Sequence, residues 1–309
     1  MNIYLKQYVE MKGEIQMKKW WLFTLLLIVL TLAACSNGET TESTATSKES
    51  NEDSRIIAGT VVLANILDRL ELDAIAVPET AKELPARFDG LPTIGNAMQP
   101  DMEIIKSLNP TEVLSVTTLE YDLKDSFAAL NIPVDFVDLT SIDSMLMEIN
   151  EIGTRYNREA QAEALVGELE QKIADVQVEA AQQNKPSVLI LLGVPGSYLV
   201  ATENSYAGDL VRLAGGVNVM QGQEPEYLAS NTEFLYNSNP DIIIRLAHGM
   251  PEQVIEMFDE EFVTNDIWKH FNAVKNGRVY DLQEDLFGTT AALNVPEALD
   301  QLMDVFYHQ

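Results

Sequence analysis

Cysteine and histidine are both scarce in this sequence. Cys35 is its only cysteine, so no disulfide can form within the chain, and the folded part must be stabilised by burial of apolar side chains. The three histidines are His248, His270 and His308, and none is paired with another in the sequence. A zinc or manganese site built from several converging imidazoles is therefore a weak interpretation.

Long hydrophobic runs are also absent. The apolar stretch near the N-terminus extends only from Trp20 to Leu30, and crossing a bilayer takes about 20 apolar residues. It follows Lys18-Lys19 and precedes Leu32-Ala-Ala-Cys35, which together have the form of a secretory signal. We therefore predict a signal peptide over residues 1–34. Its functional start is Met17, because the residues before Met17 fit no signal pattern.

The residues around Cys35 predict a membrane anchor. Leu32-Ala33-Ala34-Cys35 resembles the lipobox of bacterial lipoproteins, in which the cysteine carries diacylglycerol and the mature chain also receives an acyl group such as palmitate. Two lipid signals give lasting attachment to a membrane. The resemblance implies a protein held through Cys35 on the extracellular face of the cytoplasmic membrane. Residues 35–54 are rich in Ser, Thr, Asn and Glu and predict a flexible tether.

Positive charge is scarce. Lys and Arg number 20 against 48 Asp and Glu, which gives a formal net charge of −28. Such a surface repels phosphates, so nucleic acid is not expected as a partner. Patterns for enzyme chemistry are missing as well. Gly193-Val-Pro-Gly-Ser197 matches neither a Gly-x-Ser-x-Gly nucleophile elbow nor a phosphate-binding loop, and we expect no enzyme activity.

From Arg55 onward, short apolar runs alternate with amphipathic stretches, which is typical of an α/β fold with a largely parallel sheet. Helices are predicted over Glu103–Leu108 and Asp209–Leu213. The predicted strands are Ala74–Val77, Glu112–Val116, Val134–Val137, Ser187–Leu191, Ile242–Arg245 and Val279–Tyr280.

The middle of the chain predicts a connecting helix. Residues 141–184 contain no proline and only two glycines, Gly153 and Gly167, and their apolar residues recur at helical spacing. We predict one lobe-spanning helix over 141–184, with a break near either glycine as the alternative. It separates an N-terminal lobe at 55–140 from a C-terminal lobe at 185–309.

A repeated segment supports two related lobes. Asp101-Met-Glu103 leads to Asn109-Pro110 and a strand, and Asn231-Thr-Glu233 leads to Asn239-Pro240 and a strand, with Glu, Asn and Pro in the same register. Asn-Pro is a common stop that ends a helix and starts a strand. An ordinary solvated helix carboxylate is the alternative role for each glutamate.

Lipobox, tether, two lobes and connecting helix together resemble the class III substrate-binding proteins of ABC importers, which carry siderophores, cobalamin and haem. The resemblance implies two Rossmann-like lobes joined by one long spanning α-helix, a class III periplasmic-binding-protein-like fold. It also implies an ABC permease and its ATPase as partners. In this class a surface glutamate of each lobe docks on the permease, and these residues would be Glu103 and Glu233.

Two loop residues are candidates for ligand binding. Met98 lies in Ile94-Gly-Asn-Ala-Met-Gln-Pro100, and His248 lies in Arg245-Leu-Ala-His-Gly-Met-Pro251, both between turn residues. A thioether and an imidazole can bind haem iron from opposite faces of the ring. Taken alone, a methionine is more often a core filler and a loop histidine is more often polar surface.

Longer stretches resemble the haem-receptor lipoproteins of iron-regulated surface determinant systems. They are Val188–Thr202, Gly208–Gly216, Asn265–Phe271 and Ala273–Leu282. The resemblance implies haem b (iron protoporphyrin IX) as the transported ligand, with Met98 and His248 as axial ligands of the iron. It further implies upstream cell-surface haem-relay proteins as partners and a monomeric receptor.

The same resemblance places the haem propionates at Val61 and Val62, where Thr60 can cap a helix, and more weakly at Lys82. Ala81 departs from the pattern, because the related receptors have an aromatic residue there. Core packing is the alternative for the two valines. A ferric siderophore receptor of the same importer class and an extracellular lipoprotein enzyme acting on haem are the alternative functions.

Overall fold

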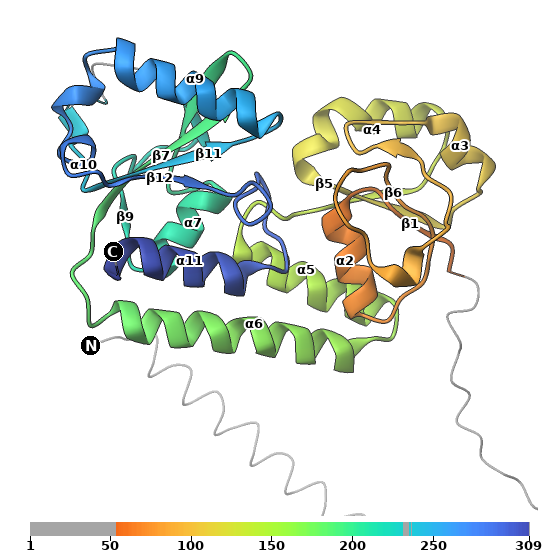
Figure 1. Cartoon of the computed structure of the whole chain (residues 1–309). Coiled ribbons are helices and arrows are strands. Elements are labelled where there is room, and N and C mark those ends of the chain that lie inside the picture. Colours follow the sequence, from red (N-terminus) through yellow and green to blue (C-terminus); the bar gives the residue numbers. More distant parts are fainter. Residues whose placement is uncertain (1–53, 231–234, 236, 309) are drawn as a thin grey trace, which may run out of the picture. The chain divides into compact units, whose positions relative to one another are not determined.

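The computed structural model describes residues 54–230, 235 and 237–308. The predicted signal peptide, Cys35, the tether up to residue 53, and Glu233 lie outside the described residues. In the part that is described, no helix combines the length and the apolar character needed to cross a membrane. Two separate sheets organise this part, one in each lobe (Figure 1).

The N-terminal lobe contains a four-stranded parallel sheet of order β2-β1-β5-β6. Its apolar faces are covered on both sides, since α2 packs in one buried cluster and α4 in another. A short hairpin of two further strands precedes α3. The elements are β1 (Ile56–Ala58), α2 (Val61–Arg69), β2 (Ala74–Ala76), β3 (Gly95–Asn96), β4 (Gln99–Pro100), α3 (Met102–Ser107), β5 (Glu112–Val116), α4 (Glu120–Ala129) and β6 (Val134–Val137).

The C-terminal lobe contains a mixed sheet of order β10-β8-β7-β11-β12, in which β9 also pairs with β7. β7, β9, β11 and β12 are parallel, whereas β8 runs antiparallel to β7 and β10. The elements are β7 (Ser187–Val194), β8 (Ser197–Ala201), α7 (Tyr206–Leu213), β9 (Val217–Asn218), β10 (Tyr227–Ala229), β11 (Ile242–Ala247), α9 (Pro251–Thr264), α10 (Asn272–Lys275), β12 (Val279–Leu282) and α11 (Val295–Tyr307).

The segment between the lobes forms two helices, α5 (Ile142–Arg155) and α6 (Glu159–Ala180). The prediction of one helix over 141–184 is therefore wrong, and the alternative of a break near Gly153 is confirmed. The chain reverses at Asn157, whose φ of 55° is left-handed, and α6 packs back against α5. Gly153 allows this close approach, because a Cβ there would lie 2.5 Å from Cβ of Ala162. Tight packing between the helices thus outweighs the helical propensity of the linking residues.

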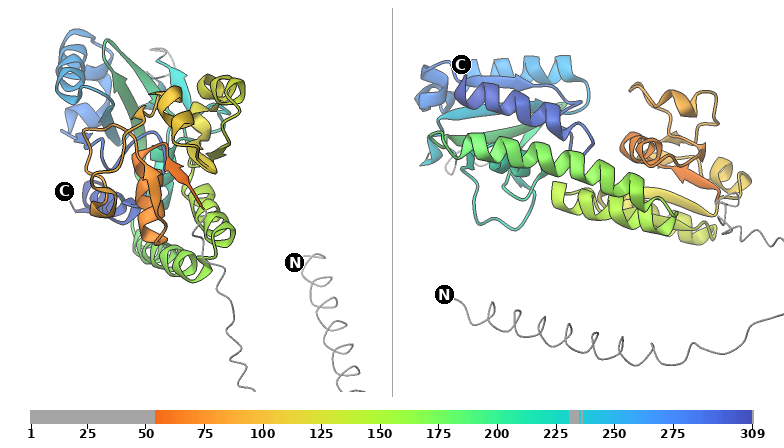
Figure 2. Two further views of the ribbon diagram at one scale, coloured as in Figure 1. Left: turned by 90° about the vertical axis from the view of Figure 1, so that its right-hand side faces the viewer. Right: turned by 90° about the horizontal axis from the view of Figure 1, so that it is seen from below.

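α6 is the element that joins the lobes. It packs against α5 on one side and against α7 and α11 of the C-terminal lobe on the other (Figures 1 and 2). Its 22 residues extend about 33 Å at 1.5 Å per residue. One cluster of buried apolar side chains runs from α2 through α6 to α11, so the two lobes share part of their core.

The repeated Asn-Pro joint has the same backbone form in both lobes. Asn109 and Asn239 are left-handed, with φ of 47° and 35°, and each is followed by proline and then by a buried strand, β5 or β11. Asparagine tolerates this conformation better than most residues, which explains its place in both copies.

Candidate functional site

A cleft of about 880 Å³ lies where elements of the two lobes face each other, a volume typical of small-molecule sites. The N-terminal lobe contributes the first turns of α2 and the loop after β2, and the C-terminal lobe contributes the loop between β12 and α11. The lining residues are Thr60, Val61, Val62, Asn65, Asp68, Arg69, Thr80, Ala81, Lys82, Glu83, Val116, Asp285, Thr290, Ala292, Leu293, Asn294 and Glu297.

The N-terminus of α2 opens into this cleft. Thr60 is the N-cap, as predicted, and its hydroxyl accepts a hydrogen bond from the Leu63 amide at 3.3 Å. Val61 and Val62 are half-buried and belong to the cleft wall. The first turn carries no acidic side chain, so its amide groups and the helix dipole favour an anion in the cleft.

Removing the cap should destabilise α2. For Thr60→Ala we expect a loss of about 1 kcal/mol in the free energy of unfolding, because the Leu63 amide loses its side-chain acceptor. Urea unfolding followed by circular dichroism measures the change. Thr60→Ser retains the hydroxyl and is the matched control, so equal losses in the two variants would contradict the capping role.

Lys82 places a positive charge at the same cleft. Its ammonium nitrogen lies 3.1 Å from Oδ1 of Asp285, and this ion pair joins the N-terminal wall of the cleft to the C-terminal wall. Both side chains are substantially exposed to solvent. Exposed pairs of this kind contribute little to stability, so the Lys82 ammonium remains available to an incoming anion.

Met98 lies at the tip of the β3–β4 hairpin and its side chain is 71% exposed. Oδ1 of Asn96 accepts from the amides of Met98 and Gln99, at 3.1 and 2.9 Å, and this fixes the turn. The Glu79 amide donates to the Gly95 carbonyl at 2.8 Å, which ties the hairpin to the segment leading to Lys82. An exposed methionine held at a rigid tip is not a core filler.

His248 follows β11 at the carboxyl edge of the C-terminal sheet and its side chain is 43% exposed. Its amide donates to the Gly193 carbonyl at 2.9 Å, and its Nδ1 lies 3.1 Å from Oε1 of Glu284. Met98 and His248 are not among the residues that line the cleft, although Glu284, which contacts His248, precedes the lining residue Asp285. Among the described residues, no three His, Cys, Asp or Glu side chains are grouped to hold a bare metal ion.

Glu103 is exposed in the first turn of α3, where Asp101 caps the helix by accepting from the amides of Glu103 and Ile104, both at 3.0 Å. Its carboxylate is therefore free to meet a partner surface. Its counterpart in the repeat, Glu233, lies outside the described residues.

Sequence reasoning missed the C-terminal wall of the cleft. Asp285 and Asn294 line it, and Glu284 contacts His248. A usable signal was present, because residues that follow parallel strands gather at one edge of a sheet, and Glu284 and Asp285 lie two and three residues after the end of β12. The prediction used that rule for His248 after β11 but not for the neighbouring strand.

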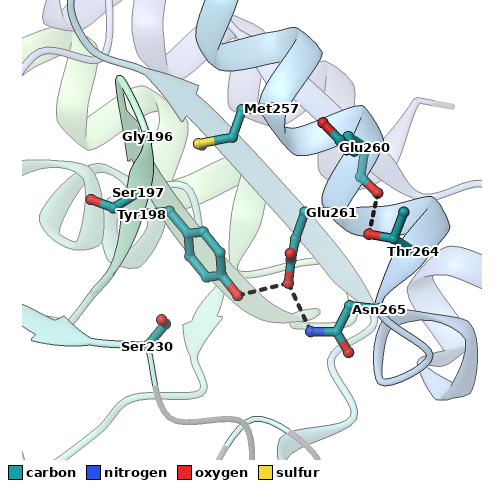
Figure 3. Close-up of a pocket in the computed structure, with 9 residues that line it drawn as sticks. All are labelled: Gly196, Ser197, Tyr198, Ser230, Met257, Glu260, Glu261, Thr264 and Asn265. Carbon is teal, nitrogen blue, oxygen red and sulfur yellow. Dashed lines mark hydrogen bonds between the residues drawn. The ribbon is translucent and has the colours of Figure 1, made fainter.

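A second cavity, of about 520 Å³, lies within the C-terminal lobe between the β7–β8 hairpin and α9 (Figure 3). Its central carboxylate, Glu261, accepts from the Tyr198 hydroxyl at 3.3 Å, the Asn265 side-chain amide at 2.8 Å and the Trp268 indole at 3.2 Å. Burial, with the nearby Glu261 charge, raises the pKa of Tyr198 to about 12. Glu261 thus joins α9 to hydrogen-bond donors from β8 and from the segment that follows α9, and we assign this cavity a structural role.

Comparison with known proteins gives consistent matches. The family model described as periplasmic binding protein matches residues 57–286. The high-affinity heme uptake system protein IsdE of Staphylococcus aureus (strain Newman) is 46% identical over 288 residues, which cover 93% of this chain and 97% of that protein.

Two solved structures match with a TM-score of 0.80. An ABC transporter substrate-binding protein from Listeria monocytogenes EGD-e is 53% identical, over 83% of this chain and 99% of that one. The S. aureus IsdE structure complexed with heme is 48% identical, over 82% of this chain and 99% of that one.

Proposed function

Because this chain belongs to the periplasmic binding protein family, we propose that it is the haem-capturing subunit of an ABC importer. The high identity to a haem uptake protein and to a substrate-binding protein, each matched along nearly its whole length, supports this function. The chain binds and delivers its ligand and is not an enzyme.

The observation that carries the proposal is the composition of the cleft. It combines the first turn of α2, which has a favourable helix dipole and no acidic side chain, with the Lys82 ammonium and half-buried apolar side chains. A porphyrin offers two anionic propionates on a flat apolar ring, so Val61, Val62 and Lys82 receive the propionates while the ring is buried. The helix dipole and the Lys82 ammonium act against the repulsion that an anion meets from the acidic surface and from the four carboxylates of the cleft wall, which are Asp68, Glu83, Asp285 and Glu297.

Met98 and His248 are the axial ligands of the haem iron in this proposal. One comes from each lobe, each follows or forms a tight turn, and each has an exposed side chain. Imidazole and thioether are established ligand types for haem iron. Binding through both faces fills the coordination sphere, which leaves no open position for haem-degrading chemistry.

Transport requires an anchor and a docking surface. Cys35 carries the lipid and holds the receptor at the extracellular face of the cytoplasmic membrane, where upstream haem-relay proteins supply the ligand. Glu103 and Glu233 dock one lobe each on the permease, which works with its ATPase. The receptor acts as a monomer, with both axial ligands from the same chain.

A haemin titration tests the function. With the chain from Ser36 onward, we expect a saturable one-to-one shift of the Soret band. The visible bands should be those of low-spin haem, because His and Met as axial ligands together impose a strong ligand field on the iron. A ferric siderophore titration, followed by tryptophan fluorescence, runs in parallel. A featureless haemin response with saturable siderophore binding would contradict the haem assignment and retain the importer class.

A further inference from the structure

His248 and Glu284 are brought together by the register of the C-terminal sheet. β11 and β12 pair in parallel with Leu246 opposite Leu282, and both strands end at this edge. The second residue after each member of that pair is His248 on one strand and Glu284 on the other. Neighbouring strands lie about 4.8 Å apart, so an imidazole and a carboxylate at these positions are within reach of each other.

The contact between the two side chains is specific. Nδ1 of His248 lies 3.1 Å from Oε1 of Glu284, whose side chain is only 22% exposed. Nδ1 itself is buried and forms no hydrogen bond within the described residues, so its approach to Glu284 is a close charge contact that a small rotation of either side chain turns into a hydrogen bond. The exposed surface of the imidazole therefore belongs to its other atoms, on the side away from Glu284.

The backbones on both sides of this contact are held. The His248 amide donates to Gly193 on β7, and the left-handed residues Gly249 and Met250 turn the chain into α9 directly afterwards. On the other side, the amides of Leu286 and Phe287 both donate to the Gln283 carbonyl at 3.1 Å. The imidazole and the carboxylate are thus presented by two anchored turns.

We infer that Glu284 is a positioning residue for the axial imidazole, which rests on the proposed role of His248 as a haem ligand. An ionised carboxylate only accepts hydrogen bonds, so it selects the tautomer with the proton on Nδ1 and leaves the Nε2 lone pair for iron. A histidine ligand whose second nitrogen donates to a carboxylate is oriented and made more basic. Glu284 therefore strengthens binding of ferric haem more than binding of ferrous haem.

Glu284→Gln tests this role in the full-length chain purified in detergent and loaded with haemin. We expect ferric haem affinity to fall about tenfold or more, as is usual when such an outer partner of a metal ligand is lost. Ferrous affinity should fall less, which raises the midpoint potential of bound haem by about 59 mV for each tenfold difference in a one-electron couple. Glu252→Gln is the matched control, because it removes one exposed carboxylate from the first turn of α9.

The outcomes separate the two hypotheses. Loss of low-spin haem in His248→Ala, with a raised potential in Glu284→Gln and none in Glu252→Gln, supports both. The same loss in His248→Ala with equal potentials in the two glutamine variants overturns the positioning role and keeps the haem receptor. Low-spin haem retained in His248→Ala overturns the ligand assignment itself. If Glu284→Gln does not fold, Glu284→Asp replaces it: a midpoint potential above those of wild type and Glu252→Gln supports the positioning role, and a potential equal to theirs overturns it.

Discussion

Replacing His248 by alanine is expected to lower haemin affinity on the order of 100-fold, equivalent to about 2.8 kcal/mol of binding free energy. The substitution removes the imidazole at the end of β11 and leaves the turn that presents it, because the His248 backbone amide still donates to Gly193. Without this ligand the iron cannot be six-coordinate through the protein, so the low-spin bands should disappear as well.

Met98→Ala should weaken haemin binding less, by about tenfold, because a soft thioether is a weaker ligand than imidazole for ferric iron. Visible absorbance titrations of both variants measure the difference. His308→Ala is the matched control, since His308 lies at the C-terminal end and pairs with Asp304 at 3.1 Å. Equal and negligible losses in His248→Ala and Met98→Ala would contradict the assignment of both ligands.

Much of the fold follows from local sequence pattern. The buried parallel strands β5, β7 and β11 are dominated by Val, Ile and Leu, with few polar residues such as Ser115 and Arg245, and such runs are recognisable without tertiary information. The Thr60 cap and the two Asn-Pro joints are equally local, because each depends on residues within one turn of the chain.

The features that sequence reasoning missed depend on distant packing. The reversal at Asn157 is favourable only because Gly153 meets Ala162 across two helices, which no local pattern reports. β8 pairs antiparallel with β10 on one side and with β7 on the other, and the turn between β7 and β8 contains Gly196, whose φ is 86°. Helix propensity and strand patterning are local properties, so they cannot predict these long-range contacts.

The candidate site likewise contains residues that could be assigned from the sequence and residues that only long-range pairing brings to the site. Val61, Val62 and Lys82 were assigned by resemblance, and the structure brings them into one cleft wall. Glu284 and Asp285 required the register between β11 and β12, a long-range pairing. Glu284 contacts His248 and Asp285 pairs with Lys82, so each of these two predicted residues has a partner that only the folded structure reveals.

Trp268→Ala should be the most destabilising single substitution that leaves every proposed haem contact in place. Trp268 is fully buried in the apolar cluster of the C-terminal lobe and stacks on Phe262, with ring centroids 4.3 Å apart and planes at 8°. Truncating a buried tryptophan costs about 3–5 kcal/mol, from lost apolar burial and from the cavity left behind. The variant also leaves Glu261 without one of its three hydrogen-bond donors.

Thermal unfolding followed by circular dichroism measures this effect, and the melting temperature should fall by about 10 °C, since about 2–4 °C is lost per kcal/mol in a protein of this size. Trp268→Phe is the matched control, because it retains an aromatic ring against Phe262 and loses the indole donor to Glu261 with part of the ring volume, for an expected loss of about 1–2 kcal/mol. At low temperature both variants should still bind haemin one to one, because the cluster lies beneath the strand that carries His248 and not in the cleft. A melting temperature in Trp268→Ala within about 2 °C of wild type would mean that the C-terminal lobe does not unfold through this cluster, and would contradict its role as the core of that lobe.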